Sequence, residues 1–163
     1  MTGTPSSLSL SGLNALIIGG SSGIGETVAH GFIDAGARVA IAARTPGKLE
    51  TALGKLAGRD PASKGYAADV TRGDELEGLA RHAMADLGRI DILMNCQGTT
   101  IIKPTLEFTQ AEFAHVMTTN LTSVFFCCTV FGRLMIAIRA AAPSSTSPRW
   151  RPTAGGRAHA PTP

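Results

Sequence analysis

Four glycines and two serines lie together in residues 19 to 25, which read Gly-Gly-Ser-Ser-Gly-Ile-Gly. Residues without a Cβ let a phosphate approach the backbone closely, and the free N–H groups and positive dipole end of a helix N-terminus attract its negative charge. The segment therefore predicts a site for a ligand pyrophosphate, with a plain tight turn as the alternative interpretation. The predicted contacts are Gly19, Ser21, Ser22, Gly23, Ile24 and Gly25.

The residues around this segment predict the elements that would position it. An apolar run over residues 13–18 indicates a buried strand, and Ile24, Val28 and Phe32 recur at intervals of four, as on one face of a helix. A strand, a glycine turn and a helix in this order form the context in which a glycine pattern indicates a dinucleotide site.

The same alternation continues along the chain. Further strands are expected over residues 37–44, 65–70 and 90–95, with amphipathic helices between them. Thr71 and Asp74 form a capping-box pattern before the third helix, and Thr109 and Glu112 form another before a long apolar helix. Short apolar strands that alternate with helices predict a parallel sheet covered on both faces, which is a doubly wound α/β fold of Rossmann type.

Two charged residues are expected at the carboxyl edge of this sheet, where ligands of open α/β folds bind. Arg44 ends the second strand. A carboxylate at this position would select NAD, and in a methyltransferase it would hold the ribose. A guanidinium instead favours the 2′-phosphate of NADP. Asp69 and Val70 end the third strand. The predicted cofactor is NADP, with NAD as the alternative. Each residue also has an interpretation without a ligand: Arg44 can simply be solvated, and Asp69 can simply accept a hydrogen bond from Thr71.

Composition limits the remaining possibilities. The chain has 163 residues and a formal net charge of +3, but residues 137–163 carry four arginines and no acid, so residues 1–136 sum to −1. We expect a flexible segment over residues 1–12, one domain over 13–136 and a disordered Pro-rich tail over 137–163. With no run of 18 apolar residues and no secretory signal, we expect a cytoplasmic protein without membrane or nucleic-acid partners. Three cysteines support neither a disulfide framework nor a zinc site.

Four motifs give residues 8–136 a resemblance to the N-terminal half of the short-chain dehydrogenase/reductase family. They are the glycine turn, the pair Asp69-Val70, the segment Asn95-Cys96-Gln97-Gly98 and the segment Asn120-Leu121-Thr122-Ser123. The resemblance implies four strands in the order 3-2-1-4 and adds Asp69, Val70, Asn95 and Gly98 to the cofactor site. It makes Asn120 the catalytic asparagine, although a polar residue in a helix can simply face water.

The family resemblance also implies groups that this sequence does not contain. Complete members transfer a hydride between nicotinamide and a small-molecule substrate, with a serine and a Tyr-x-x-x-Lys motif, yet the only tyrosine here is Tyr66 and the last lysine is Lys103. We therefore expect a truncated or frame-shifted oxidoreductase that is inactive in this form. The alternative is a non-catalytic half-domain that binds nucleotide or pairs with a partner. An uncovered helix over residues 110–136 would favour such pairing or self-association.

Overall fold

The computed structural model describes residues 9–141 of the chain. A parallel four-stranded sheet runs in the order β3-β2-β1-β4, which confirms the predicted order. The strands are β1 (Asn14–Ile18), β2 (Arg38–Ala43), β3 (Lys64–Ala67) and β4 (Ile92–Asn95). Most of the predicted lead-in 1–12 and tail 137–163 lies outside the described residues.

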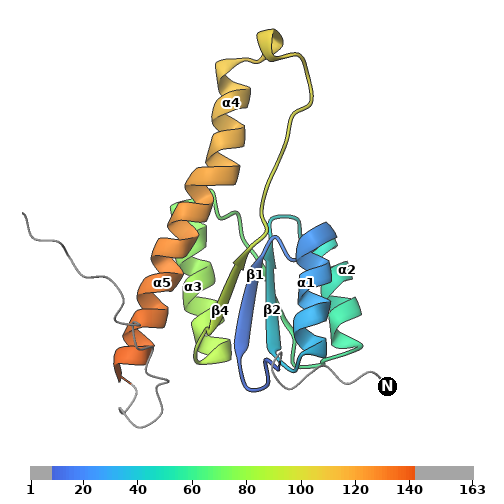
Figure 1. Cartoon of the computed structure of the whole chain (residues 1–163), viewed down its shortest axis with the longest axis vertical. Coiled ribbons are helices and arrows are strands. Elements are labelled where there is room, and N and C mark those ends of the chain that lie inside the picture. The colour runs from blue at the N-terminus through green and yellow to red at the C-terminus, as the bar shows by residue number, and fades with distance from the viewer. Residues whose placement is uncertain (1–8, 142–163) are drawn as a thin grey trace, which may run out of the picture.

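Helices cover both faces of the sheet, as the doubly wound fold requires (Figure 1). On one face lie α1 (Gly23–Asp34) and α2 (Pro46–Ala57), and on the other lie α3 (Gly73–Leu87) and α5 (Ser123–Ala141). The two central strands are buried almost throughout, because apolar side chains on their two faces pack into two separate clusters. Leu16 packs toward α3 and α5, whereas Ile17 packs toward α1 and α2.

The start of α3 differs from the prediction. The N-cap is Arg72 and it makes no side-chain cap hydrogen bond, so the capping box expected from Thr71 and Asp74 was wrong. The Thr71 hydroxyl instead donates to Asp69 Oδ1 at 2.7 Å. Because α3 begins at Gly73, Thr71 lies one residue before the N-cap position, and its hydroxyl bonds within the turn to Asp69 instead.

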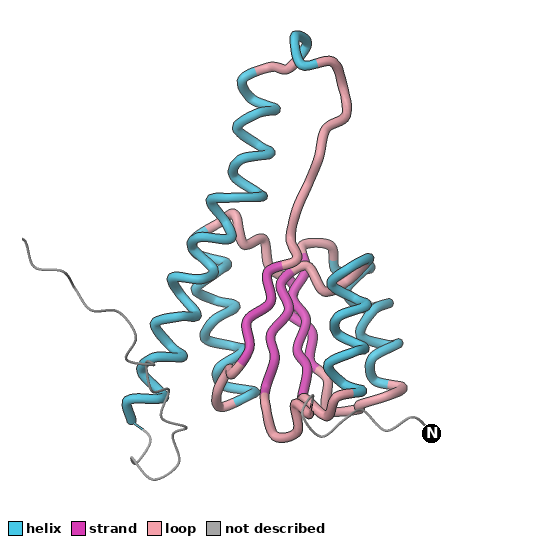
Figure 2. The backbone as a smooth tube through the Cα atoms, in the orientation of Figure 1, coloured by secondary structure: helices cyan, strands magenta, loops and turns pink. Residues whose placement is uncertain are grey.

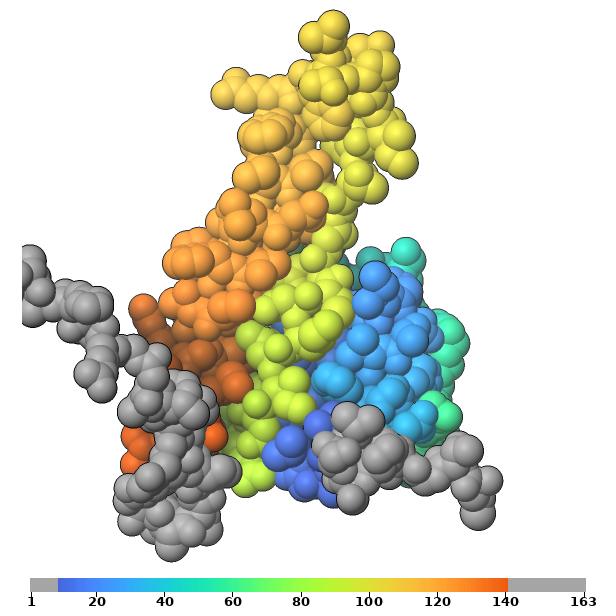
Figure 3. Space-filling view, in the orientation of Figure 1, coloured from blue at the N-terminus to red at the C-terminus, as the bar shows by residue number. Residues whose placement is uncertain are grey.

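The chain leaves β4 and forms an arm, defined here as residues 99–122, which rises from the carboxyl edge of the sheet (Figures 1 and 2). The arm contains α4 (Gln110–Met117) and a π-helical turn, Thr118–Thr122, that joins α4 to α5. The capping box predicted from Thr109 and Glu112 is confirmed, with both reciprocal hydrogen bonds present. No residue of α4 is buried, and the space-filling view shows the upper part of the arm projecting beyond the body (Figure 3).

Helix α5 ends at Ala141, five residues beyond the expected end of the patterned region at residue 136. The continuous helix Gln110–Ala140 has a mean hydropathy of 1.9 over an 18-residue window, so it meets the length and composition of a membrane span. Core helices meet the same criterion, which makes it weak evidence. In the described residues this helix contributes Cys127 and Phe131 to the core against α3 and the sheet.

Candidate functional site

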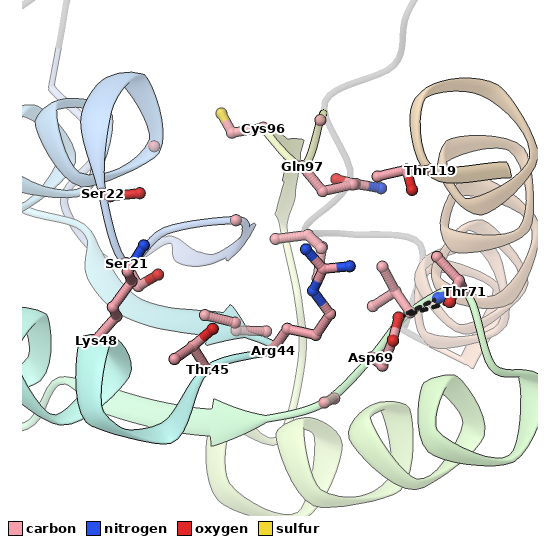
Figure 4. A pocket seen from close by; sticks show the side chains of 18 of the residues that line it. Ser21, Ser22, Arg44, Thr45, Lys48, Asp69, Thr71, Cys96, Gln97 and Thr119 are labelled. Atoms are coloured by element: carbon pink, nitrogen blue, oxygen red, sulfur yellow. Dashed lines mark hydrogen bonds between the residues drawn. The ribbon is translucent and has the colours of Figure 1, made fainter. Parts of the chain in front are cut away.

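A pocket of about 360 Å³ opens at the carboxyl edge of the sheet (Figure 4). The glycine turn, the ends of β2 and β3, the segment after β4 and the π-helical turn all contribute to it. The predicted site residues that line it are Ile24, Arg44, Asp69, Val70, Gly98, Gly19, Ser21, Ser22 and Gly25. Thus segments far apart in the sequence meet here because parallel strands bring their carboxyl ends to one edge.

Three glycines of the turn differ in the space around them. Gly19 has a φ of +79°, and a Cβ there would lie 2.7 Å from the Cys96 carbonyl carbon. A Cβ on Gly25 would collide with the Gly19 carbonyl oxygen. Gly23 has a φ of +55° and open space where a Cβ would lie. Gly19 and Gly25 therefore permit close packing of the turn itself rather than the open approach that we expected of all three glycines, and Gly23 has open space but does not line the pocket.

The first turn of α1 offers donors to a ligand. Glu26 makes the first backbone hydrogen bond of the helix, to the Ser22 carbonyl, so the N–H groups before it have no partner within the helix. The N-cap residue, Ser22, makes no side-chain cap hydrogen bond. Ile24 is 76% exposed at the pocket and adds an apolar surface beside these donors. These groups suit an anion attached to a flat apolar ring.

Asp69 lies two residues beyond the end of β3 and faces Arg44 across the pocket (Figure 4). Its Oδ1 accepts hydrogen bonds from the Thr71 backbone N–H at 3.0 Å and from the Thr71 hydroxyl at 2.7 Å. Partial burial acts to raise the pKa of Asp69, but the Thr71 hydrogen bonds and the charges of Arg44 and Arg72 outweigh it and lower that pKa. The carboxylate is therefore ionised. Asp69 both accepts hydrogen bonds from Thr71 and lines the pocket, so the two interpretations of this residue are compatible.

Three predicted residues do not line this pocket: Gly23, Asn95 and Asn120. The Asn95 side-chain amide turns to α5 and donates to Cys128 Sγ at 3.4 Å. Asn120 lies in the π-helical turn and holds Thr99 at two points: its Nδ2 donates to the Thr99 carbonyl and its Oδ1 accepts from the Thr99 N–H, both at 2.8 Å. The side chain of Asn120 thus joins the two ends of the arm, and its catalytic role stays a prediction.

Several residues that the sequence analysis did not single out as site residues also line the pocket. They are Thr45, Lys48, Thr71, Cys96, Gln97 and Thr119. Lys48 follows Arg44 by four residues, at the start of α2, so the end of β2 and the beginning of the next helix bring both cations to one side of the pocket. The strand end and the proline at the helix start could have identified Lys48 from the sequence.

Buried side-chain atoms beside the pocket lack a hydrogen-bond partner among the described residues. Gln97 Nε2 donates to Ser123 Oγ at 3.2 Å, but Gln97 Oε1 and Thr119 Oγ1 are buried without a partner among the described residues. Leaving such groups unpaired costs about 1–3 kcal/mol each. The burial of Cys96 raises its thiol pKa, so that side chain remains a neutral thiol in the pocket wall. The segment after β4 therefore contributes polar but uncharged groups.

Comparisons with known proteins agree on one kind of protein. The family model for short chain dehydrogenases matches residues 13–142. A tropinone reductase homolog of Arabidopsis thaliana is 38% identical over 118 residues, and D-threitol dehydrogenase of Mycolicibacterium smegmatis is 32% identical over 127 residues. The matches cover 72% and 78% of this chain but only 44% and 49% of those proteins. The chain spans about half the length of these relatives.

Solved structures show the same relation. A short-chain type dehydrogenase/reductase from Mycobacterium marinum superposes with a TM-score of 0.76 at 35% identity, covering 80% of this chain and 53% of that one. The RhlG/NADP active-site complex of Pseudomonas aeruginosa superposes with a TM-score of 0.74 at 33% identity, covering 84% of this chain and 52% of that one.

Proposed function

The chain belongs to the short-chain dehydrogenase/reductase family of oxidoreductases, and from that premise we propose that it binds NADP(H) in the pocket at the carboxyl edge of its sheet. The family generally binds NAD(P). The observation that carries the choice of NADP is Arg44, which lines the pocket at the end of β2 without an ion-pair partner among the described residues. A guanidinium there can bind a phosphate in a bidentate manner, and a 2′-hydroxyl offers it no charge.

The residues of the pocket fit such a cofactor. The free N–H groups at the start of α1 can receive the pyrophosphate, and Ser21 and Ser22 lie in the same pocket lining. Asp69 and Val70 end the neighbouring wall, where a carboxylate can accept from an exocyclic amine. When bound, the cofactor would supply a hydride donor or acceptor for carbonyl reduction or alcohol oxidation.

We extend the proposal to turnover: the 163-residue chain holds the cofactor but does not itself catalyse hydride transfer. The reaction needs a group that gives or takes the substrate oxygen's proton. Tyr66 does not line the pocket, and its hydroxyl donates to Asp86 at 2.9 Å. Burial and the Asp86 carboxylate raise the pKa of Tyr66 above its ordinary value. Tyr66 is therefore a poor proton donor and lies outside the pocket. In the described lining, the polar groups near Gln97 are uncharged.

The experiment is a titration of the purified chain with NADPH and NADH by isothermal calorimetry, followed by assays on a panel of ketones and secondary alcohols. We expect NADPH binding that is stronger than NADH binding, with no turnover above the uncatalysed rate. An Arg44→Ala variant should lose the preference for NADPH. Absence of binding by both nucleotides would contradict the cofactor proposal, and ordinary rates of ketone reduction would contradict the proposal of an inactive chain.

A second candidate function is pairing through the long helix. Phe113, Met117, Leu121 and Phe125 follow one another at intervals of four and are exposed, with Phe125 64% exposed. This spacing puts the four side chains on one face, and an exposed apolar stripe indicates an interaction surface. We propose that it pairs with the same helix of another copy or of a related protein.

Sedimentation equilibrium tests the pairing. A Leu121→Glu substitution should shift the chain toward monomer, because the charge would have to be buried between the two helices. Ala111→Glu is the control, since residue 111 is exposed and lies on the opposite side of the same helix from Phe113. Equal effects of the two substitutions, or a monomeric wild type at all concentrations, would contradict the proposal.

A further inference from the structure

Two cations lie in the β2 corner, defined here as Ser21, Arg44, Thr45 and Lys48 of the pocket lining. Figure 4 shows Lys48 extending from α2 toward Ser21, and Arg44 lying between this group and Asp69. The ion pairs among the described residues engage other lysines and arginines, and none involves Arg44 or Lys48. Both cations are exposed, and Asp69, which faces Arg44, is the acidic residue of the pocket lining.

The β2 corner also contains unused hydrogen-bond donors. Thr45 is the N-cap of α2, but its side chain makes no cap hydrogen bond. The first backbone bond of that helix runs from the Leu49 N–H to the Thr45 carbonyl at 3.0 Å, which leaves the N–H groups of Gly47 and Lys48 without a partner in the helix. These groups add neutral donors next to the two charges.

Charge is distributed unevenly along the pocket. Arg44 and Lys48 lie on the β2 side, and Asp69 is the only acidic residue in the lining. The opposite side, formed by Cys96, Gln97, Gly98 and Thr119, carries no charged side chain. A ligand with one strongly anionic end and one neutral end would therefore be oriented with its anionic end at the β2 corner.

The chemistry of the β2 corner specifies the kind of anion. A phosphate monoester carries a charge of about −1.5 to −2 near neutral pH and three acceptor oxygens, so it can satisfy two cations at once. The planar guanidinium of Arg44 suits two of those oxygens, while the Lys48 ammonium acts as a compact point charge. A ribose with free hydroxyls leaves both cations without an anionic partner.

Building on the proposed function of this pocket, we propose that Lys48 is a second phosphate-binding residue beside Arg44 and determines the preference for a 2′-phosphate. We further infer that the pocket of this chain is sufficient for the adenosine end alone. Adenosine 2′,5′-bisphosphate places one phosphate for the β2 corner and one for the glycine turn, and it should bind nearly as well as NADPH. The neutral nicotinamide end has no charged contact in the described lining.

The test is calorimetry on the full chain at low salt with four ligands: NADPH, NADH, adenosine 2′,5′-bisphosphate and adenosine 5′-diphosphate. Lys48→Ala should weaken NADPH and the bisphosphate about tenfold or more, as expected for loss of a hydrogen bond to a charged group, and should leave NADH unchanged. Lys48→Arg should restore most of the affinity. The matched control is Lys55→Ala, on the same helix but outside the pocket lining, where Lys55 pairs with Glu26 at 2.7 Å.

The outcomes separate this inference from the proposed function. If wild-type chain binds neither NADPH nor NADH, the proposed cofactor site fails. If NADPH binds but Lys48→Ala weakens NADH equally, or weakens neither nucleotide, the role of Lys48 is wrong while the cofactor site stands. If the bisphosphate binds more than about a hundredfold more weakly than NADPH, the pocket also depends on the nicotinamide end, and the inference of a sufficient adenosine site is overturned.

Discussion

The sheet body and the arm of this protein are stabilised by different interactions. In the body, Leu16, Ile17 and Ile41 are fully buried, and the apolar clusters on both sheet faces supply the stabilisation. In the arm, α4 has no buried residue, and it is held by a capping box, the Lys103–Glu112 pair and the Asn120–Thr99 hydrogen bonds. The contrast teaches that one site can combine walls held by different interactions, since Thr119 of the arm lines the same pocket as the glycine turn of the body.

The largest expected difference is between two phenylalanines of α5. Phe131 is fully buried in the core and Phe125 is mostly exposed. Phe131→Ala should lower the free energy of unfolding by about 3–5 kcal/mol, because it leaves a cavity as well as removing buried apolar surface. Phe125→Ala should change it by less than about 0.5 kcal/mol, as is usual at exposed positions. Urea denaturation of both variants measures the difference, and similar losses would contradict the difference in burial between the two positions.

A smaller difference is expected between two glycines. A Cβ at Gly25 collides with the Gly19 backbone, whereas Gly54 in α2 has open space. Gly25→Ala should destabilise the chain by about 1–3 kcal/mol through overpacking and abolish NADPH binding. Gly54→Ala should stabilise the helix by up to about 1 kcal/mol and leave binding intact. Thermal melts and calorimetry check both variants; retained NADPH binding by Gly25→Ala would show that the turn tolerates rearrangement.

The third prediction concerns the hydrogen bonds that close the arm. Asn120→Ala removes both bonds to the Thr99 backbone, each worth about 0.5–1.5 kcal/mol. We expect faster hydrogen exchange at Thr99 and in the segment that follows it, with little change in the strands of the body. Thr122→Ala in the same π-helical turn serves as the control. Unchanged exchange at Thr99 would mean that the arm is held by other contacts.

The smallest expected effect is a pH dependence of the arm. Hydrogen bonds from Lys103 and Thr109 lower the pKa of Glu112 to about 2, below its ordinary value of 4.5. Because the pKa is lowered in the folded chain, the stabilisation is fully present above pH 4.5 and is lost as the pH falls toward 2. NMR of the Thr109 and Glu112 amides should follow this loss. In Glu112→Gln the amides should show no such transition, and an identical acid transition there would contradict the assignment.

Much of the fold could be predicted from the sequence because it depends on local patterns. The apolar run before Gly19 predicts β1, the intervals of four in α1 predict its buried face, and the Thr109–Glu112 box predicts the start of α4. The strand order came from the family motifs. The Thr71–Asp74 box failed because the helix begins one residue later than the pattern predicts, with Arg72 as the N-cap, and the Thr71 hydroxyl bonds to Asp69.

The candidate site was predictable only in part. Residues at strand ends, such as Arg44 and Asp69, reach the pocket because parallel strands end at one edge. Thr119 required the tertiary structure, since its side chain reaches the pocket from the arm. Asn95 shares the strand-end position but turns to α5, because alternate residues of a strand point to opposite faces.

The sequence by itself determined the alternation of strands and helices, the glycine turn and the family, because these depend on residue type and short spacing. The tertiary structure alone decided which side chains share the pocket, that Arg44 and Lys48 remain without ion partners among the described residues, and that Asn120 holds Thr99. The physical reason is that contacts between distant segments depend on the packing of whole elements, which residue spacing along one segment does not specify.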